Sequence, residues 1–181
     1  MPLAEKKTYT IDDILALPEN VRAELIDGRI YYQAAPSRTH QRIIGDLYLK
    51  IRTHINSKGG KCEVYLAPFA VFLTENNKDY IEPDLTVVCD ESKLTEEGCK
   101  GAPDFIIEVV SPSTRNMDYG KKMIKYATAG VREYWIVDRE KNRITTYDFE
   151  KEEYNDYTFS DTVRAGIFDD LEISFSELNM K

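Results

Sequence analysis

Apolar side chains recur at helical spacing over one long stretch in the first half of the chain, residues 37–58. Its apolar positions are Ile44, Leu47, Tyr48, Ile51 and Ile55. This repeat predicts an amphipathic helix with one buried face. Ser37 suits the N-cap, and Gly59-Gly60 suits the C-terminal end. A shorter helix is expected over Thr10–Leu15, with Asp13 as the capping-box partner of its first residue.

Two runs of the sequence are continuously apolar rather than alternating, Leu85–Val88 and Phe105–Val110. Such strands are buried on both faces, which predicts that they lie in the centre of a sheet. A helical pattern over about Asn116–Ala129 follows the second run, and Glu133–Val137 then returns as a strand. Strand, helix and strand with short connections predict a right-handed crossover in a partly parallel sheet. Trp135, in the returning strand, is expected to be buried.

The segments around this unit are shorter. Residues 21–25 are expected to form a helical turn before the strong turn signal Asp27-Gly28. Residues 62–66 and 69–73 predict two strands separated by a proline kink. Residues 90–101 are expected to form a charged, mobile loop.

The C-terminal part is rich in tyrosine. Ile144–Phe149 and Tyr154–Phe159, separated by a charged turn, predict an antiparallel hairpin with one polar face. Together these elements predict a single α/β domain over residues 1–181. We expect a central mixed β-sheet flanked by helices, with an antiparallel hairpin at the C-terminal end.

The composition is that of a globular protein, with 42% hydrophobic and 31% charged residues and no apolar run near membrane-spanning length. The N-terminus lacks the apolar core of a signal peptide, so we expect a cytoplasmic protein. The three cysteines show no metal-binding spacing and are expected to be free thiols. A net charge of −8 argues against a dedicated nucleic-acid coat. It does not exclude a nuclease, because a divalent cation offsets site carboxylates.

Two carboxylates occur in these apolar surroundings. Asp84 stands at the head of the first continuous run, and Glu108 lies inside the second. If the two strands are neighbours, the carboxylates can meet, and a cation between them would relieve their repulsion. Hard oxygen ligands with room for water suit Mg²⁺ or Mn²⁺. Such an ion polarises a phosphoryl oxygen and lowers the pKa of an attacking water.

A lysine on the following helix is the third candidate. Asp118, Lys122 and Tyr126 share one helix face, whereas Lys121 and Lys125 are expected to turn toward solvent. Spacing alone favours a surface ion pair between Asp118 and Lys122, worth a few tenths of a kcal/mol. Position favours a functional role, because a helix packed on the Glu108 strand can bring an ammonium near the metal. There it could orient the water or stabilise charge on phosphorus.

Pro83-Asp84, followed by a strand that carries Glu108, resembles the PD-(D/E)XK nuclease superfamily, although Val110 stands where that pattern has lysine. The string from Glu108 to Asp138, with Ser111–Thr114, Gly130-Val131 and Tyr134-Trp135, resembles one branch, the Uma2 family. In that branch the lysine lies on the following helix, which matches Lys122.

The same resemblance covers roughly Tyr9 to Phe175 and bears on two further residues. Local patterns favour a solvated helix acid for Glu24 and a surface or packing residue for His40. Glu24-Leu25-Ile26-Asp27-Gly28 matches the family's N-terminal motif, whose acid belongs to the site. His40 matches a position where a histidine often begins the long helix.

The resemblance implies a restriction-endonuclease-like core and Mg²⁺- or Mn²⁺-dependent hydrolysis of DNA phosphodiester bonds. The implied metal ligands are Asp84, Glu108 and Glu24, with Lys122 as a further catalytic residue. It also implies a homodimer, for which the tyrosine-rich hairpin is a candidate interface. Lesser site candidates are His40, Asp104, Asp118 and Tyr126.

Two other functions remain open. One is a degenerate nuclease fold that binds nucleic acid or a partner protein without turnover, which the displaced lysine and the net charge favour. The other is a glycosidase in which Asp84 and Glu108 act as paired carboxylates. Metal dependence separates them, because glycosidase chemistry of this kind needs no divalent ion and a binding module shows no turnover.

Overall fold

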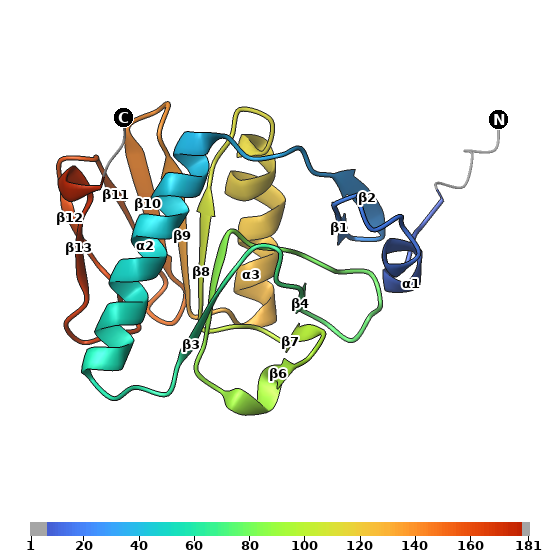
Figure 1. Cartoon of the computed structure of the whole chain (residues 1–181), viewed down its shortest axis with the longest axis horizontal. Coiled ribbons are helices and arrows are strands. Elements are labelled where there is room, and N and C mark those ends of the chain that lie inside the picture. Colours follow the sequence, from blue (N-terminus) through green and yellow to red (C-terminus); the bar gives the residue numbers. More distant parts are fainter. Residues whose placement is uncertain (1–6, 179–181) are drawn as a thin grey trace.

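The structure is a computed structural model that describes residues 7–178. Its centre is a six-stranded mixed sheet with the strand order β11-β10-β9-β8-β5-β3 (Figure 1). The strands are β3 Glu63–Leu66, β5 Leu85–Val88, β8 Phe105–Val109, β9 Glu133–Asp138, β10 Arg143–Asp148 and β11 Glu153–Tyr157. Only β8 and β9 pair in parallel within this sheet, as expected for the two ends of the predicted crossover.

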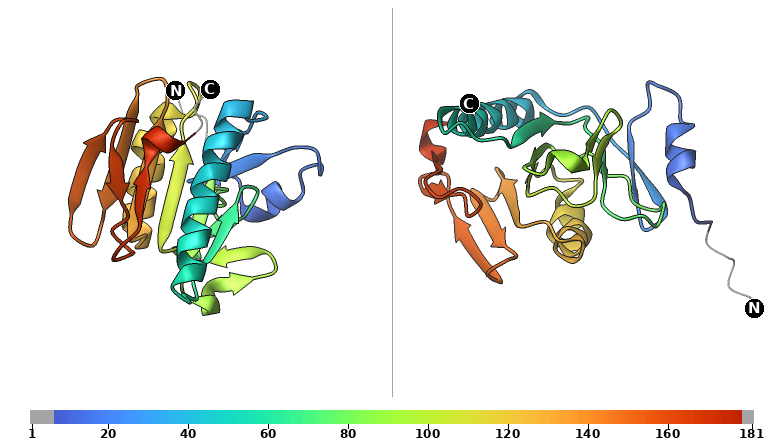
Figure 2. Two further views of the ribbon diagram at one scale, coloured as in Figure 1. Left: turned by 60° about the vertical axis from the view of Figure 1, so that its left-hand side comes forward. Right: turned by 90° about the horizontal axis from the view of Figure 1, so that it is seen from below.

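Helices cover both faces of the sheet (Figure 2). On one face lies α2 (Arg38–Ser57), whose N-cap Ser37 accepts a hydrogen bond from the His40 backbone N–H. On the other face lie the π-helical segment η2 (Met117–Lys122) and α3 (Met123–Ala129), which form one continuous helical stretch.

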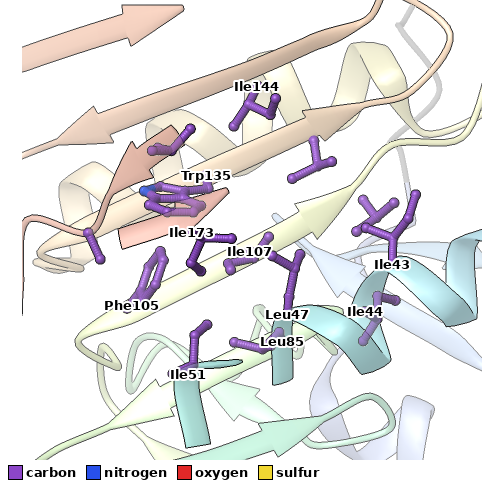
Figure 3. Packing of buried hydrophobic residues seen from close by; sticks show 14 of the residues in the cluster. Ile43, Ile44, Leu47, Ile51, Leu85, Phe105, Ile107, Trp135, Ile144 and Ile173 are labelled. Atoms are coloured by element: carbon purple, nitrogen blue, oxygen red, sulfur yellow. The ribbon is translucent and has the colours of Figure 1, made fainter. Parts of the chain in front are cut away.

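Alternate residues of the central strands supply the two cores. Phe105, Ile107 and Trp135 face α2 and pack with its apolar stripe (Figure 3). Ile106 and Tyr134 face the opposite side, where Tyr126 of α3 packs on them. Trp135 is fully buried, which confirms the expectation for this residue.

The N-terminal segment forms a small unit beside the sheet (Figure 1). It contains α1 (Ile11–Leu15), begun by the predicted capping box, and the hairpin β1 (Ala23–Ile26) and β2 (Arg29–Tyr32). The helical turn expected over residues 21–25 is therefore wrong. Asp27-Gly28 forms a two-residue turn with φ of 52° and 68°, the geometry that joins adjacent antiparallel strands.

The segment expected to be a charged loop is also structured. It contains the short helix η1 (Glu91–Lys93) and the strands β6 (Leu94–Thr95) and β7 (Gly98–Lys100). These strands form a three-stranded sheet with β4 (Val71–Phe72). Gly98 permits this pairing, since a Cβ at its φ of 142° would lie 2.2 Å from the Ala70 carbonyl oxygen.

The C-terminal hairpin is present, as β10 pairs antiparallel with β11. After it, β12 (Thr162–Arg164), β13 (Glu172–Ser174) and the short helix η3 (Phe175–Glu177) pack on the α2 side of the sheet. Within residues 7–178, no helix is long and apolar enough to cross a membrane.

Two of the three cysteines are joined, which corrects the expectation of free thiols. Cys62 and Cys89 form a disulfide, and Cys99 is free and buried. The register of β3 on β5 pairs Glu63 with Val88, so the next residues outward face each other across the two strands. A sequence separation of 27 residues gave no sign of this proximity.

Candidate active site

Strands β5 and β8 bring the two predicted carboxylates together. The antiparallel register pairs Leu85 with Ile107, so Asp84 stands opposite Glu108 at the end of these strands. Asp84 Oδ2 accepts a hydrogen bond of 2.8 Å from the Val109 backbone N–H, which fixes the carboxylate against β8. The two strands are therefore neighbours, which was the condition for Asp84 and Glu108 to meet.

Lys122 lies beside these carboxylates, as the sequence predicted. Its Nζ donates to Glu108 Oε1 at 3.0 Å and to Glu24 Oε1 at 2.9 Å, and lies 3.9 Å from Asp118 Oδ1. All four side chains are at most 6% exposed. The surface ion pair that the spacing favoured is therefore wrong, because Lys122 is a buried cation among three acids.

Asp118 and Lys122, four residues apart on one helix face, lie in a π-helical segment. Both residues lie within η2 (Met117–Lys122), where one extra residue is accommodated in the turn. Insertions of this kind are common at functional sites. Val110, at the position where the superfamily pattern has lysine, is buried and packs in the core on this side of the sheet.

The other two lysines of this helix also have partners. Lys121 Nζ donates to the Tyr31 hydroxyl at 3.0 Å. Lys125 Nζ lies 2.7 Å from carboxylate oxygens of both Asp27 and Asp79, and its side chain is 17% exposed. The expectation that Lys125 turns toward solvent is wrong, because it joins the helix to two loops.

Glu24 is a strand residue rather than a solvated helix acid. It lies on β1, is 4% exposed, and its Oε1 accepts the Glu82 backbone N–H at 3.0 Å as well as the Lys122 ammonium. Tyr126, another candidate, donates its hydroxyl to Glu108 Oε1 at 2.9 Å. Both residues thus hold the Lys122–Glu108 pair in place.

His40 lies at the site, whereas Asp104 does not. His40 Nε2 is 3.1 Å from Asp84 Oδ2, and its buried Nδ1 has no hydrogen-bond partner within residues 7–178. Burial lowers the pKa of His40, but the hydrogen bond and charge of Asp84 outweigh it, so the pKa is raised. Asp104 lies at the opposite end of β8, where it accepts the Cys89 N–H and binds Arg132.

Burial controls the charge of this cluster. It raises the pKa of Glu108 well above its usual range, against the opposing effect of Lys122. The pKa of Asp118 is raised to about 6 by burial, again opposed by Lys122. Burial lowers the pKa of Lys122, but the charges of Glu108 and Glu24 raise it by more. The ammonium therefore stays protonated. Burial thus disfavours the ionised forms of Glu108 and Asp118, whereas Lys122 remains charged.

Each of the three predicted ligands uses only one carboxylate oxygen for contacts with other described residues. The contacting atoms are Asp84 Oδ2, Glu108 Oε1 and Glu24 Oε1. The second oxygens carry no hydrogen bond within residues 7–178, and hard carboxylate oxygens suit Mg²⁺ or Mn²⁺. Among the described residues, however, no group of three or more His, Cys, Asp or Glu side chains is already arranged around an ion position. Lys122 separates Glu24 from the Asp84–Glu108 pair.

The carboxylates line a cavity of about 630 Å³ between the β1–β2 hairpin, the start of α2 and the turn after β8. One of its residues was missed by the sequence analysis. Glu82 is 9% exposed and forms an ion pair of 2.8 Å with Arg22, and its backbone N–H holds Glu24. Its position two residues before Asp84 was the only signal for it.

Comparison with known families gives a match over most of the chain. The family model Uma2, described as "putative restriction endonuclease", matches residues 11–180. The chain belongs to the Uma2 family. The family description supports a nuclease function for this Uma2 protein.

Two individual proteins are similar to this Uma2 protein. Uncharacterized protein slr1290 of Synechocystis sp. (strain ATCC 27184 / PCC 6803 / Kazusa) is 30% identical over 125 residues, which cover 68% of this chain and 64% of that protein. The match thus spans less than two thirds of the curated relative. A crystal structure described as a putative nuclease belonging to DUF820 from Anabaena variabilis ATCC 29413 has a TM-score of 0.76 at 22% identity. The structural match covers 93% of this chain and 96% of the Anabaena chain. It confirms the expected restriction-endonuclease-like fold.

Proposed function

We propose that this protein is a divalent-metal-dependent endonuclease that hydrolyses phosphodiester bonds of DNA. One observation carries the proposal: Asp84 and Glu108 stand opposite each other, each with an unengaged carboxylate oxygen, beside the buried ammonium of Lys122. Two acids and a lysine in this relation are the outline of the nuclease superfamily that the sequence resembles. Membership of the Uma2 family supports a nuclease function, and the carboxylate geometry supports metal dependence.

Asp84 and Glu108 would hold Mg²⁺ or Mn²⁺ through their second oxygens. Glu24, which the resemblance gives as a third ligand, would instead support the site from the far side of Lys122, through the bonds of its Oε1 to Lys122 and the Glu82 N–H. When bound, such an ion polarises a phosphoryl oxygen and makes water a stronger nucleophile. A cation at this position would favour the ionised forms of Glu108 and Asp118, which burial opposes.

In this proposal Lys122 acts as a hydrogen-bond donor rather than as a general base. Its raised pKa keeps the ammonium protonated, so it cannot accept a proton from water at neutral pH. Two of its three N–H groups are held by Glu24 and Glu108, and the third can donate a hydrogen bond to an attacking water or to a phosphoryl oxygen on which charge develops. Glu24 fixes the ammonium, and the Tyr126 hydroxyl fixes Glu108.

The proposal also includes the cellular compartment and the oligomeric state of the enzyme. We propose a cytoplasmic homodimer that meets through the C-terminal hairpin. In its support, the edge strand β11 pairs only with β10 among the described strands, and Tyr154 on it is 69% exposed. The Cys62–Cys89 disulfide does not support the cytoplasmic assignment, because disulfides are rare in a reducing compartment.

Cleavage of supercoiled plasmid DNA in Mn²⁺ tests the proposal. The wild-type protein should nick the plasmid, EDTA should stop it, and Asp84→Asn should abolish it. The matched control is Glu97→Gln, which alters an exposed carboxylate in the turn between β6 and β7. The proposal fails if wild type and Asp84→Asn nick the plasmid at equal rates.

A binding module is the second candidate, because buried Val110 leaves the usual lysine position of the superfamily empty of charge. On this hypothesis the protein would retain DNA in a gel-shift assay in Mn²⁺ and leave it uncut over prolonged incubation. Turnover that depends on Asp84 would exclude it.

A further inference from the structure

The buried face of α2 begins with a histidine. Ile44, Leu47 and Ile51 belong to the apolar stripe that packs on the sheet (Figure 3). His40 precedes Ile44 by one helical turn, so it continues the same face, and its side chain is only 15% exposed. Packing of α2 on the sheet therefore places this imidazole at the end of the strands where Asp84 stands.

The imidazole contacts a predicted metal ligand. His40 Nε2 lies 3.1 Å from Asp84 Oδ2, the oxygen that also accepts the Val109 backbone N–H at 2.8 Å. An ionised carboxylate only accepts hydrogen bonds, so Nε2 carries a hydrogen and donates it. The other ring nitrogen, Nδ1, is buried and has no hydrogen-bond partner within residues 7–178.

Helix packing alone does not account for a histidine at this position. The stripe that follows it consists of apolar side chains such as Ile44 and Leu47. A buried ring nitrogen without a partner costs free energy that an apolar side chain of similar size avoids. What His40 adds over such a side chain is the donor to Asp84.

Two donors thus hold one oxygen of Asp84 and leave the other. The Val109 N–H comes from β8 and the His40 N–H from α2, and both reach Oδ2. The carboxylate of an aspartate otherwise turns easily about its last side-chain bond. Outer donors of this kind orient carboxylates that ligate metals. With Oδ2 held, Oδ1 keeps one orientation in the cavity that Asp84 and His40 both line.

We propose that His40 is a positioning residue: together with the Val109 N–H, it holds Asp84 Oδ2 so that Oδ1 is presented to the cation. This inference rests on the metal site of the proposed function. A ligand that is held before binding loses less freedom when the ion arrives, so the donor strengthens cation binding. Loss of His40 should therefore weaken Mn²⁺ binding without weakening the fold.

The second histidine of the chain provides a matched control. His54 also lies on α2, its side chain is 14% exposed, and its Nε2 is 3.4 Å from Asp170 Oδ1. Neither His54 nor Asp170 lines the cavity. Loss of a half-buried imidazole beside an aspartate is thus common to changes at both positions, whereas contact with a metal ligand is particular to His40.

Calorimetric titration with Mn²⁺ compares wild type with His40→Leu, His40→Gln and His54→Leu. His40→Leu should bind Mn²⁺ about 10- to 100-fold more weakly, the usual loss for an outer partner of a metal ligand. The glutamine amide nitrogen can take the place of Nε2 and donate to Asp84, so His40→Gln should restore most of the affinity. His54→Leu should bind like wild type. Without metal, His40→Leu should unfold at a temperature no lower than that of wild type.

Imidazole ¹⁵N spectra test the contact itself without metal. In His54→Leu the remaining histidine is His40, so the spectrum reports on this ring alone. A hydrogen should be found on Nε2, and an Nε2 without hydrogen would overturn the inference.

The titrations separate this inference from the proposed function. Mn²⁺ affinity of His40→Leu equal to that of wild type would overturn the inference and leave the metal site standing. Tighter binding would do the same, because it is expected if the ring acted only as a positive charge near the ion. An equal loss in His40→Leu and His40→Gln would also overturn it. No Mn²⁺ binding by wild type would overturn the metal site of the proposed function, and this inference with it.

Discussion

Glu108 and Glu133 are two buried glutamates on adjacent parallel strands, and only one of them belongs to the site. They are 4% and 3% exposed, and burial raises the pKa of each. Glu133 uses both oxygens: Oε1 accepts the Trp135 indole N–H and the Gly166 N–H, and Oε2 accepts the Ile167 N–H. Glu108 uses Oε1 alone, with Lys122 and Tyr126 as its donors.

The difference teaches that burial of an acid does not by itself mark a functional site. Glu133 is fully occupied by neutral donors and ties the segment around Gly166 to the α2 side of the sheet. Glu108 points to the other side, shares a cavity with Asp84, and keeps one oxygen without a hydrogen bond among the described residues. The unengaged oxygen, rather than burial or a raised pKa, is what suits Glu108 to a cation.

The largest expected effect is on catalysis by Glu108→Gln. The amide loses the charge that attracts a cation, so the rate of DNA cleavage should fall by ~100-fold or more, beyond the loss typical of outer-shell changes at metal sites. The glutamine oxygen can still accept from Lys122 and Tyr126, so the fold should remain. Initial rates in Mn²⁺ and thermal unfolding check both statements. A variant rate within threefold of wild type would place Glu108 outside the reaction.

The next largest effect is on stability, from Glu133→Gln. A glutamine has one accepting oxygen, so its NH₂ group must face an N–H donor that the carboxylate now satisfies. Leaving buried polar groups unpaired should cost about 3 kcal/mol of unfolding free energy. Urea denaturation measures it, and the cleavage rate per folded molecule should not change. A stability equal to that of wild type would show that Glu133 is not the anchor described above.

Much of this comparison could be predicted from the sequence. The two continuous apolar runs indicated central strands, and Asp84 and Glu108 at their ends met because β5 and β8 are neighbours. The return of the chain through a helix to Glu133–Asp138 indicated the parallel pair and the place of Lys122. These features depend on hydrophobic pattern and short connections, which are local properties.

The rest depends on contacts between distant segments. The sequence around Glu133 does not show that both its oxygens are occupied, because two of its three donors come from Gly166 and Ile167, more than thirty residues later. Glu24 resembled a helix acid because its strand is stabilised by a hairpin partner and by Tyr80, not by its own apolar repeat. The π-helical segment that buries Lys122 has no sequence signature of its own.

A smaller effect concerns the pH dependence of stability. The pKa of Asp118 is about 6 in the folded protein and near 3.8 when unfolded. Because the folded pKa is the higher one, Asp118 stabilises the folded protein below pH 3.8. This contribution to the free energy of unfolding is lost as pH rises through about 6. Metal-free wild type should lose about 2 kcal/mol more than Asp118→Asn between about pH 4 and about pH 7. Urea denaturation across this range checks it, and parallel profiles would contradict it.

The smallest effect is expected for Trp135→Phe, which removes one donor from Glu133. The ring that packs against Phe105 is largely kept, while the hydrogen bond of 2.7 Å is lost. A single hydrogen bond contributes about 1 kcal/mol, so the melting temperature should fall by only a few degrees. Cleavage by the folded variant should equal that of wild type. A fall in rate without a fall in stability would instead link Trp135 to the reaction.

Calorimetric titration with Mn²⁺ tests the central claim most directly, namely that the unengaged oxygens of Asp84 and Glu108 form a cation site. Wild type and Glu133→Gln should bind Mn²⁺ with the same affinity, because the oxygens of Glu133 are already occupied. Asp84→Asn and Glu108→Gln should each lose binding, since the amide removes a charged ligand. Equal Mn²⁺ affinity in wild type and Asp84→Asn, or no binding to wild type, would contradict the account.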